Sequence, residues 1–302
     1  MIGGIVEIAD SGRHVSIYRG FLKVSDQESE LGRVPLGDIT ALILSGPQIT
    51  LSKAVMVELA ERKAVIVTSG RNWHPISMTL PFGVHFEAAG ILNDQIKLSE
   101  PNRKRMWQQI VKCKIGNQAC VLEKQVPDSP VVASLYTLQK RVKSGDPDNM
   151  EAQAARQYWP ALLGAVFRRD RHAEDTNVYL NYGYTVLRAA AARAVCGSGL
   201  HPSLGLHHGN RVNAFALVDD VMEPFRPLVD QVAKQISENT QAMGPNEKRQ
   251  LAAVLQADMI MEHGVAPAMN CITRLAQSLV RSVSEGKAEL ALPTVRPGDL
   301  LV

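Results

Sequence analysis

Residues 81–98, PFGVHFEAAGILNDQIKL, divide the chain into two parts, because a strand-like sequence pattern gives way to a helical one within them. Before Pro81 the apolar residues fall in short alternating or β-branched runs, which are typical of strands. After Gly83 they recur at helical spacing, with breaks at Gly, Pro and Asp clusters. We therefore expect an α+β protein with a small β-rich N-terminal domain over residues 1–84 and a larger all-α C-terminal domain over residues 85–302.

The N-terminal strand patterns are short and separated by turn residues, and they fall at residues 4–9, 15–24, 30–36 and 74–80. Residues 39–69 are expected to form a strand, a helix and a second strand. Such a unit can bind a dinucleotide, but its loop, residues 45–48 (SGPQ), has one glycine and a proline without an N–H. That composition disfavours a phosphate-binding loop.

The C-terminal part is predicted to be a series of helices, over residues 88–98, 101–124, 130–143, 150–163, 178–195, 214–237, 246–263 and 266–285. The clearest breaks between them are residues 144–149 and 197–210, which are rich in Gly, Pro, Asp or Ser.

The composition excludes several classes of protein. With 45% hydrophobic and 21% charged residues in 302, the chain is neither disordered nor fibrous. Its four cysteines form no CxxC pair, so we expect reduced thiols rather than a disulfide framework or a zinc site. The start, MIGGIVEIAD, lacks a basic region before an apolar block, and the longest uncharged stretch, 194–210, is broken by Gly and Pro. We expect a soluble, cytoplasmic protein without a membrane segment.

Positive charge is concentrated in the helical part. Residues 101–143 hold nine Lys or Arg and two acidic residues, and a second basic cluster lies at residues 168–171. Such clusters bind the phosphate backbone of nucleic acids, but a solvated helix face has the same composition. Trp107, in the first cluster, is open to two interpretations, a platform for base stacking or, as is more usual for a helix aromatic, a core residue.

Residues 149–159, NMEAQAARQYW, contain the first candidate for chemistry. The preceding DPDN is a helix-start signal, so Glu151 falls in the first turn. Ala154, Ala155 and Tyr158 share its face, and the small residues leave room beside the carboxylate. The alternative is an acid that merely complements the helix dipole.

The second candidate is the loop at residues 201–210, HPSLGLHHGN, which holds three of the eight histidines. Histidines on a glycine-rich loop are placed for function more often than those on an apolar helix face. Adjacent histidines point in different directions, so we expect only one of His207 and His208 to face a given site. A polar turn with a structural imidazole is the alternative.

The third candidate is residues 219–227, DDVMEPFRP. Asp220 and Glu223 share a helical face and repel each other unless a cation lies between them, and Pro224 should kink the helix. An exposed acidic face is the alternative. Two carboxylates and one imidazole suit Mg²⁺ or Mn²⁺ with open water positions better than a closed zinc site.

Taken in order, these three motifs and the β-rich start resemble the CRISPR-associated protein one family, the metal-dependent integrases of CRISPR adaptation. The segments MEPFRP (222–227) and NYGY (181–184) resemble the branch found in type II systems. The resemblance covers nearly the whole chain. It implies that Glu151, His208 and Glu223 are the catalytic metal ligands. Asp220 and His207 are secondary candidates, and Ala152 stands where the family commonly has Gly.

The resemblance also implies a function and partners. It implies a homodimer, paired through the N-terminal domains, that assembles with CRISPR-associated protein two and holds a short double-stranded DNA, the prespacer. Each free 3′-OH of that DNA attacks a phosphodiester at the edge of a CRISPR repeat, with Mg²⁺ or Mn²⁺ bound at the site. No membrane is expected among the partners. The expected DNA-backbone contacts are Arg103, Lys104, Lys112, Lys140, Arg141, Arg168, Arg169 and Arg171.

Two other functions are compatible with the same residues. Water could replace the 3′-OH, which would make the protein a structure-selective, metal-dependent DNA nuclease. Alternatively, the acids and the histidine could be structural, in a DNA-binding scaffold without catalysis.

Overall fold

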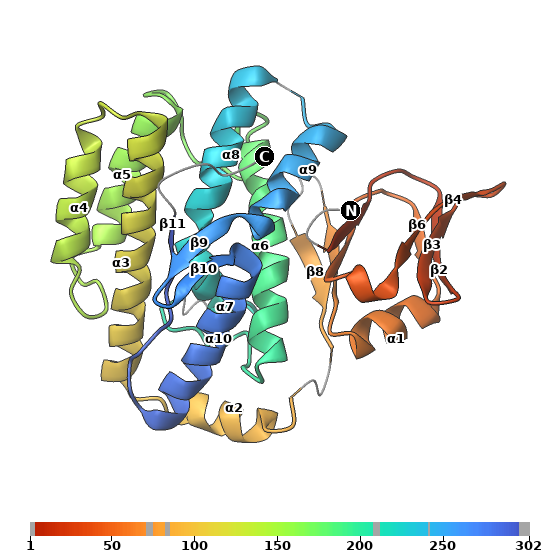
Figure 1. Cartoon of the computed structure of the whole chain (residues 1–302), viewed down its shortest axis with the longest axis horizontal. Helices are drawn as coiled ribbons and strands as arrows, with labels where there is room; N and C mark the ends of the chain where they lie inside the picture. Colours follow the sequence, from red (N-terminus) through yellow and green to blue (C-terminus); the bar gives the residue numbers. More distant parts are fainter. Residues whose placement is uncertain (1–3, 71–74, 82–84, 208–211, 241, 296–302) are drawn as a thin grey trace.

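The computed structural model describes residues 4–70, 75–81, 85–207, 212–240 and 242–295. Figure 1 shows a β-rich N-terminal part at one end, in red to orange, and a larger helical part beside it. The α+β class and this order of the two parts are as expected. The expected domain boundary, between residues 84 and 85, adjoins residues 82–84, which lie outside the described part of the chain.

Two four-stranded sheets build the N-terminal part. The first has the order β1 (Ile5–Ile8), β5 (Ala41–Leu44), β7 (Val65–Ser69) and β8 (Pro75–Thr79), and only β8 is antiparallel to its neighbour. The second has the order β4 (Glu30–Pro35), β3 (Phe21–Ser25), β2 (Arg13–Tyr18) and β6 (Ile49–Leu51). Helix α1 (Lys53–Glu61) lies between β6 and β7 in the chain, so the expected strand, helix and strand over residues 39–69 are present.

The prediction of a single strand over residues 15–24 is wrong, because a hairpin turn divides this stretch into two strands. Strands β2 and β3 pair antiparallel, and the turn between them is Arg19-Gly20, with φ of 47° and 82°. Two consecutive positive φ values characterise the two-residue hairpin turns that match strand twist.

The first sheet joins the two parts of the molecule, because successive residues of a strand face opposite sides. One side packs into the helical core through Ile5, Ala41, Ile43, Val65 and Val67. The other side forms a separate core with α1 and the second sheet, through Val6, Ile8, Leu42, Leu44 and Ile66.

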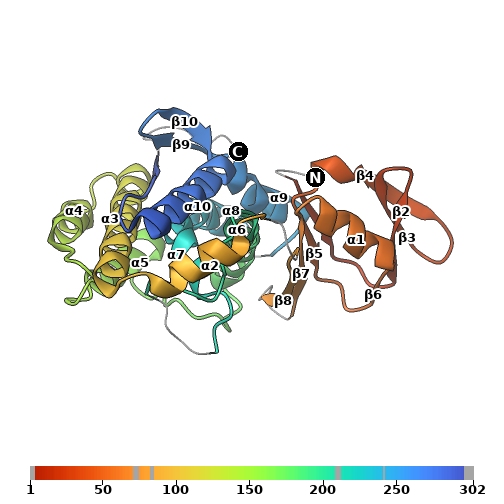
Figure 2. The same cartoon turned by 90° about the horizontal axis from the view of Figure 1, so that it is seen from below.

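The helical part is built around α6 (Asn177–Gly197), most of which is buried. Figures 1 and 2 both place α6 among α7, α8 and α10. A Cβ at Gly183 would collide with Val229 of α8, so glycine permits the close approach of these two helices. The other helices are α2 (Ala88–Lys97), α3 (Glu100–Gln125), α4 (Val131–Arg141), α5 (Met150–Leu163), α7 (Ala216–Met222), α8 (Arg226–Asn239), α9 (Pro245–Ala253) and α10 (Ala268–Glu285).

The expectation of an all-α C-terminal part is wrong. A three-stranded antiparallel sheet contains β10 (Gly264–Pro267), β9 (Asp258–Met261) and β11 (Thr294–Val295). The helix expected over residues 246–263 therefore ends at Ala253. Met259 and Met261 are buried while their neighbours in β9 are exposed, and this alternation of burial has the period of two that is typical of a strand. Gly264, the first residue of β10, has a φ of +113°.

Within the described residues, no helix is both long enough and apolar enough to cross a bilayer. All four cysteines are free thiols, with Cys271 buried and the others half-buried.

Candidate metal centre

Glu151 is held by a well-anchored helix start. The buried carboxylate of Asp146 accepts hydrogen bonds from the backbone N–H groups of Met150 (2.8 Å) and Glu151 (3.0 Å). The side chain of Asn149 accepts another from Ala152 (3.3 Å). The expected helix start is confirmed, with Glu151 in the first turn of α5. These bonds satisfy N–H groups that a helix leaves unpaired, and they fix the backbone that carries the carboxylate.

Glu223 lies where a helix is interrupted. Helix α7 ends at Met222, a 3₁₀ turn covers Glu223–Phe225, and α8 begins at Arg226. The predicted break at Pro224 is therefore present, as a proline without an N–H requires. The Glu223 residue is only 3% exposed, so its carboxylate must be paired with cations or strong donors.

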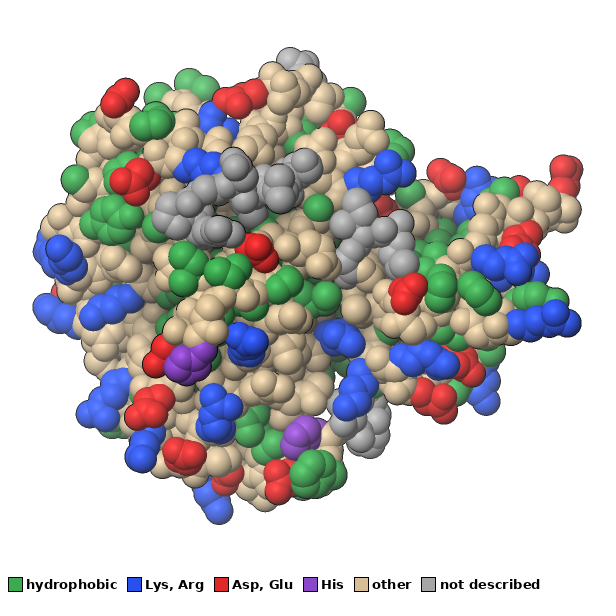
Figure 3. All heavy atoms as spheres, viewed as in Figure 1, with side chains coloured by type: hydrophobic (Ala, Val, Ile, Leu, Met, Phe, Trp, Pro, Cys, Tyr) green, Lys and Arg blue, Asp and Glu red, His purple; other side chains and the backbone are tan. Residues whose placement is uncertain are grey.

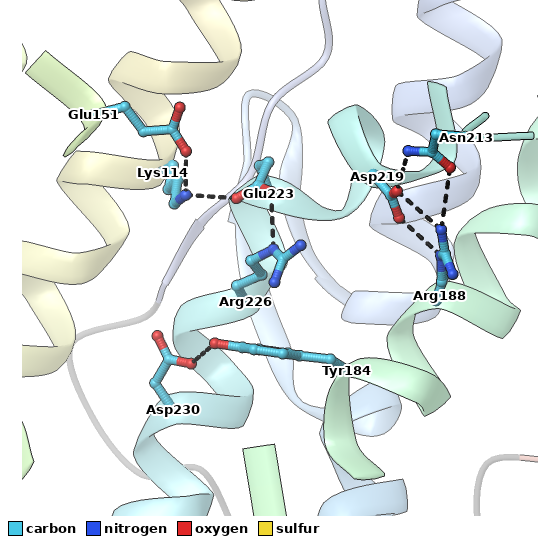
Figure 4. Close-up of polar contacts among 9 residues, drawn as sticks. All are labelled: Lys114, Glu151, Tyr184, Arg188, Asn213, Asp219, Glu223, Arg226 and Asp230. Atoms are coloured by element: carbon cyan, nitrogen blue, oxygen red, sulfur yellow. Dashed lines mark hydrogen bonds and ion pairs between the residues drawn. The ribbon is translucent and has the colours of Figure 1, made fainter. Parts of the chain in front are cut away.

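Glu151 and Glu223 converge on one cation, the ammonium of Lys114 on α3 (Figure 4). The Nζ atom lies 2.5 Å from Oε1 of Glu151 and 2.6 Å from Oε2 of Glu223, so the two oxygens are at most about 5.1 Å apart. The other Glu223 oxygen, Oε1, lies 2.9 Å from Nε of Arg226. Lys114 is one of the nine basic residues of 101–143, but neither it nor Arg226 was expected at the metal site.

Electrostatics keep both cations charged. Burial alone lowers the pKa of Lys114, but Glu223 and Glu151 outweigh it, and the pKa lies above its usual value. Burial likewise lowers the pKa of Arg226, and the attraction of Glu223 reverses that effect. The site thus contains two carboxylates in direct contact with two cations, and its charges balance.

The residues present fit a hard divalent cation. Two carboxylate oxygens already share one cation, and oxygen ligands are what Mg²⁺ and Mn²⁺ prefer. Among the described residues, no group of three His, Cys, Asp or Glu side chains could hold a metal ion. The third expected ligand, His208, lies outside the described residues.

Asp220 holds the loop that leads to His208. Its Oδ2 atom accepts hydrogen bonds from the backbone N–H groups of Leu206 (2.6 Å) and His207 (3.2 Å), and the residue is fully buried. Asp220 therefore faces the loop, whereas Glu223 faces Lys114. The repulsion expected between the two acids is relieved by separate partners rather than by one shared cation.

Asp219 acts at the other end of the same loop. It forms a two-point ion pair with Arg188, at 2.8 and 2.9 Å, and accepts a 2.8 Å hydrogen bond from Nδ2 of Asn213. The two neighbouring acids of α7 thus fix the chain on both sides of residues 208–211.

His207 packs on Trp107. Their rings are parallel within 2° and their centroids are 4.5 Å apart. Trp107 is 1% exposed, so it is a core residue that supports the loop and offers no free surface for a base. The stacking occupies one face of the His207 ring.

A cavity of about 220 Å³ adjoins the carboxylate pair and is lined by residues that include Lys114, Arg169, Tyr184, Arg226 and Asp230. The Tyr184 hydroxyl donates a 2.5 Å hydrogen bond to Asp230 (Figure 4), and the guanidinium of Arg226 lies 4.6 Å from the centre of the Tyr184 ring. Burial raises the pKa of Asp230 to about 7. Only Arg169 was expected to have a functional role, although Tyr184 belongs to the NYGY segment.

The residues expected to contact DNA fall in separate places. Lys112, Lys140 and Arg141 line one groove of about 780 Å³ between α3 and the end of α4, together with Arg105 and Lys143. Figure 3 shows basic side chains gathered along this side of the molecule.

The other expected contacts lie outside that groove. Arg103 borders a different hollow, and Lys104 pairs with Glu100 at 2.7 Å. Between α5 and α6, Arg168 and Arg171 are exposed, whereas Arg169 points into the cavity beside the carboxylates.

Solved structures show which class of protein shares this fold. The structure named "Casposase bound to integration product" has a TM-score of 0.80 and 18% identity, and the match covers 95% of this chain and 92% of that one. The "Cas6-RT-Cas1--Cas2 complex" has a TM-score of 0.77 and 20% identity, over 95% of this chain and 35% of that one. The chain thus has the fold of casposases and Cas1 proteins.

The sequence then identifies the family. Residues 6–259 match the family described as "CRISPR associated protein Cas1". The "CRISPR-associated endonuclease Cas1" of Neisseria meningitidis serogroup C (strain 8013) is 35% identical over 295 residues, which is 96% of each protein. The chain belongs to the Cas1 family of CRISPR-associated proteins, which confirms the resemblance found in the sequence.

Proposed function

We propose that this protein is a metal-dependent DNA integrase of CRISPR adaptation, which joins the 3′-OH ends of a prespacer to a CRISPR repeat by transesterification. One observation carries the proposal. Glu151 and Glu223, on elements far apart in the chain, place carboxylate oxygens at most about 5.1 Å apart around a single cation, beside a cavity lined with arginines. Such a site suits a reaction in which negative charge develops on phosphate oxygens.

Glu151, Glu223 and His208 would hold Mg²⁺ or Mn²⁺, with His207 as the alternative imidazole and Asp220 as a further candidate acid. The bound ion would lower the cost of forming the 3′-alkoxide and neutralise charge on the pentavalent phosphorus. Other residues of the protein hold the metal ligands in position. Arg226 orients the Glu223 carboxylate, and Asp220 holds the loop that leads to the histidines. No protein nucleophile is required.

The groove of Lys112, Lys140 and Arg141 would bind DNA backbone away from the reacting phosphate. Residues two apart on a helix lie on opposite sides, so Lys112 and Lys114 face different sides of α3, about 10–12 Å apart across the helix. DNA that reaches both must follow the surface around α3. Arg168, Arg169 and Arg171 would contact DNA nearer the metal. Binding through many phosphates should be strongly salt-dependent.

Features of the relatives support the partners. The casposase structure is bound to an integration product, and another related structure is a complex that includes Cas1 and Cas2. We propose the same kind of DNA substrate and CRISPR-associated protein two as partner, in a type II-like system. We also propose a homodimer, paired through an N-terminal domain of residues 1–84. Its exposed edge strand β8 presents Ile76, which is 70% exposed, and an edge strand of this kind suits pairing.

Hydrolysis is the second candidate reaction, because the curated relative is named an endonuclease and water could take the place of the 3′-OH. One assay separates the two. A labelled target repeat is incubated with Mn²⁺ and donor DNA that ends in a 3′-OH or a 3′-deoxynucleotide. Joined products that need the 3′-OH support the integrase, and cleavage that persists with the 3′-deoxy donor supports the nuclease.

Glu223→Gln is the variant for the same assay. It keeps the size of the side chain, whereas Glu223→Ala would leave Lys114 and Arg226 buried beside a missing partner, at a cost of about 3–5 kcal/mol. We expect Glu223→Gln to bind DNA but not to join or cleave it. Activity equal to the wild type would instead support a scaffold in which these acids are structural.

A further inference from the structure

Lys114 occupies the position that a divalent cation would need. Its ammonium contacts one oxygen of Glu151 and one of Glu223, and its side chain is only 12% exposed (Figure 4). Together with Arg226, which binds the other oxygen of Glu223, it balances the charge of both carboxylates. The ammonium holds the buried carboxylate of Glu223 close to the half-buried carboxylate of Glu151, although the two like charges repel each other.

A metal and this ammonium cannot share the carboxylates. Both are attracted to the same two oxygens, Oε1 of Glu151 and Oε2 of Glu223, and two cations only a few ångströms apart repel each other strongly where little water screens them. Glu223 cannot easily offer its second oxygen, because Nε of Arg226 lies 2.9 Å from it. A metal that binds Glu151 and Glu223 must therefore displace Lys114.

The adjoining cavity is the space that can receive the displaced side chain. Lys114 already lines it, together with Arg169 and Arg226. The guanidinium of Arg169 is held by the amide oxygens of Asn177 and Asn181, at 2.8 Å each. These neutral partners orient the charge without cancelling it, and the two acids that line the cavity already have partners, Asp230 in Tyr184 and Glu223 in Arg226. A second cation arriving beside Arg169 therefore favours a further anion.

We propose that Lys114 is the resident cation of the carboxylate pair, that the divalent metal displaces it into this cavity, and that a DNA phosphate bound there receives it together with Arg169. The proposal rests on the proposed function. It makes metal binding and phosphate binding mutually favourable through a residue of the chain itself. Lys114 thereby acts as a positioning residue, first for the carboxylates and then for the phosphate.

The test is Mn²⁺ binding to the full-length protein without DNA, measured by calorimetry for the wild type and for Lys114→Met. We expect Lys114→Met to bind Mn²⁺ at least about tenfold more tightly, because no internal cation has to leave. Its Tm without metal should fall below that of the wild type, and Mn²⁺ should raise it further than it raises the wild-type Tm. A short duplex should tighten Mn²⁺ binding more in the wild type than in Lys114→Met.

Lys97→Met is the matched control, because it removes an exposed lysine on α2 outside the candidate sites, and we expect wild-type affinity. Lys114→Arg keeps the positive charge and should bind Mn²⁺ no more tightly than the wild type. If Lys114→Met does not fold, Lys114→Gln replaces it.

Two outcomes overturn different statements. If the wild type binds Mn²⁺, Glu151→Gln weakens that binding and neither neutral Lys114 variant strengthens it, the role assigned to Lys114 is wrong while the metal site stands. If no protein binds Mn²⁺ at this site and Glu151→Gln changes nothing, the proposed function fails instead.

Discussion

The buried carboxylate of Asp220 accepts a 2.6 Å hydrogen bond from the backbone N–H of Leu206, which lies on the loop just before the paired histidines. A residue that the sequence offered as a possible metal ligand therefore holds the backbone that leads to another expected ligand. The interaction joins α7, which ends at Met222 just before Glu223, to the histidine loop, so helix and loop are positioned together.

Removing the Asp220 carboxylate should loosen that loop. We expect Asp220→Ala to lower the free energy of unfolding by about 1–3 kcal/mol, because two backbone N–H groups lose their acceptor. Asp220→Asn keeps one oxygen acceptor and should fall between the wild type and Asp220→Ala. Urea denaturation measures the stability and Mn²⁺ titration measures the site. An Asp220→Ala protein with wild-type stability and metal affinity would refute this role.

His207 and His208 should have different functions. His207 is stacked on the buried Trp107, so His207→Ala should cost about 0.5–1.5 kcal/mol of stability and leave Mn²⁺ binding largely intact. His208→Ala should abolish strand joining with little change in stability. Thermal unfolding and the strand-joining assay on both variants check this. The reverse pattern would move the ligand assignment to His207.

Asp230 should make stability depend on pH. An unfolded Asp titrates near about 3.9, while burial raises the pKa of Asp230 to about 7 despite the hydrogen bond from Tyr184 and the nearby charges of Arg226 and Lys114. Between these values the native state keeps a proton that the unfolded state has lost. The free energy of unfolding should therefore decrease as pH rises through this window, by roughly 1–4 kcal/mol.

Asp230→Asn is the control for that prediction, because the amide stays neutral and can still accept the Tyr184 hydrogen bond. Denaturation at several pH values between about 4 and 7 should show the variant gaining stability relative to the wild type as pH rises. Parallel curves for the two proteins would contradict the raised pKa.

The groove between α3 and α4 should contribute sequence-independent DNA affinity. Lys140→Ala and Arg141→Ala should each lower the slope of log K against log salt by about one and weaken binding equally on unrelated duplexes. Fluorescence anisotropy at several salt concentrations measures this, with Lys97→Ala as the exposed control. A loss confined to one DNA sequence would indicate base recognition instead.

The sequence predicted those parts of the fold that depend on local chemistry. The DPDN helix start before Glu151 and the break at Pro224 follow from capping and from the missing proline N–H, and both are present. The hairpin at Arg19-Gly20 and the small sheet at residues 258–267 were missed. Each lies within a stretch whose apolar residues resemble one continuous element until the pairing of its strands is known.

The candidate site could be predicted only in part for a similar reason. Glu151 and Glu223 stand in recognisable motifs, whereas Lys114 is one of four lysines in a long helix, and nothing in the local sequence distinguishes it from the other three. Its place between the carboxylates depends on how α3, α5 and α7 pack together, and no local sequence pattern predicts that packing. Asp230 gains its raised pKa in the same way, through tertiary burial.

Whether Glu151 and Glu223 hold a divalent metal can be seen in a crystal of the protein soaked in Mn²⁺, with anomalous scattering measured to locate the ion. We predict one strong peak between the carboxylates of Glu151 and Glu223, with the imidazole of His208 as a third ligand at about 2.0–2.5 Å. Lys114 should then be displaced from both carboxylates. A Mn²⁺ peak elsewhere, with Lys114 still between Glu151 and Glu223 at saturating metal, would show that the two carboxylates are not the metal site.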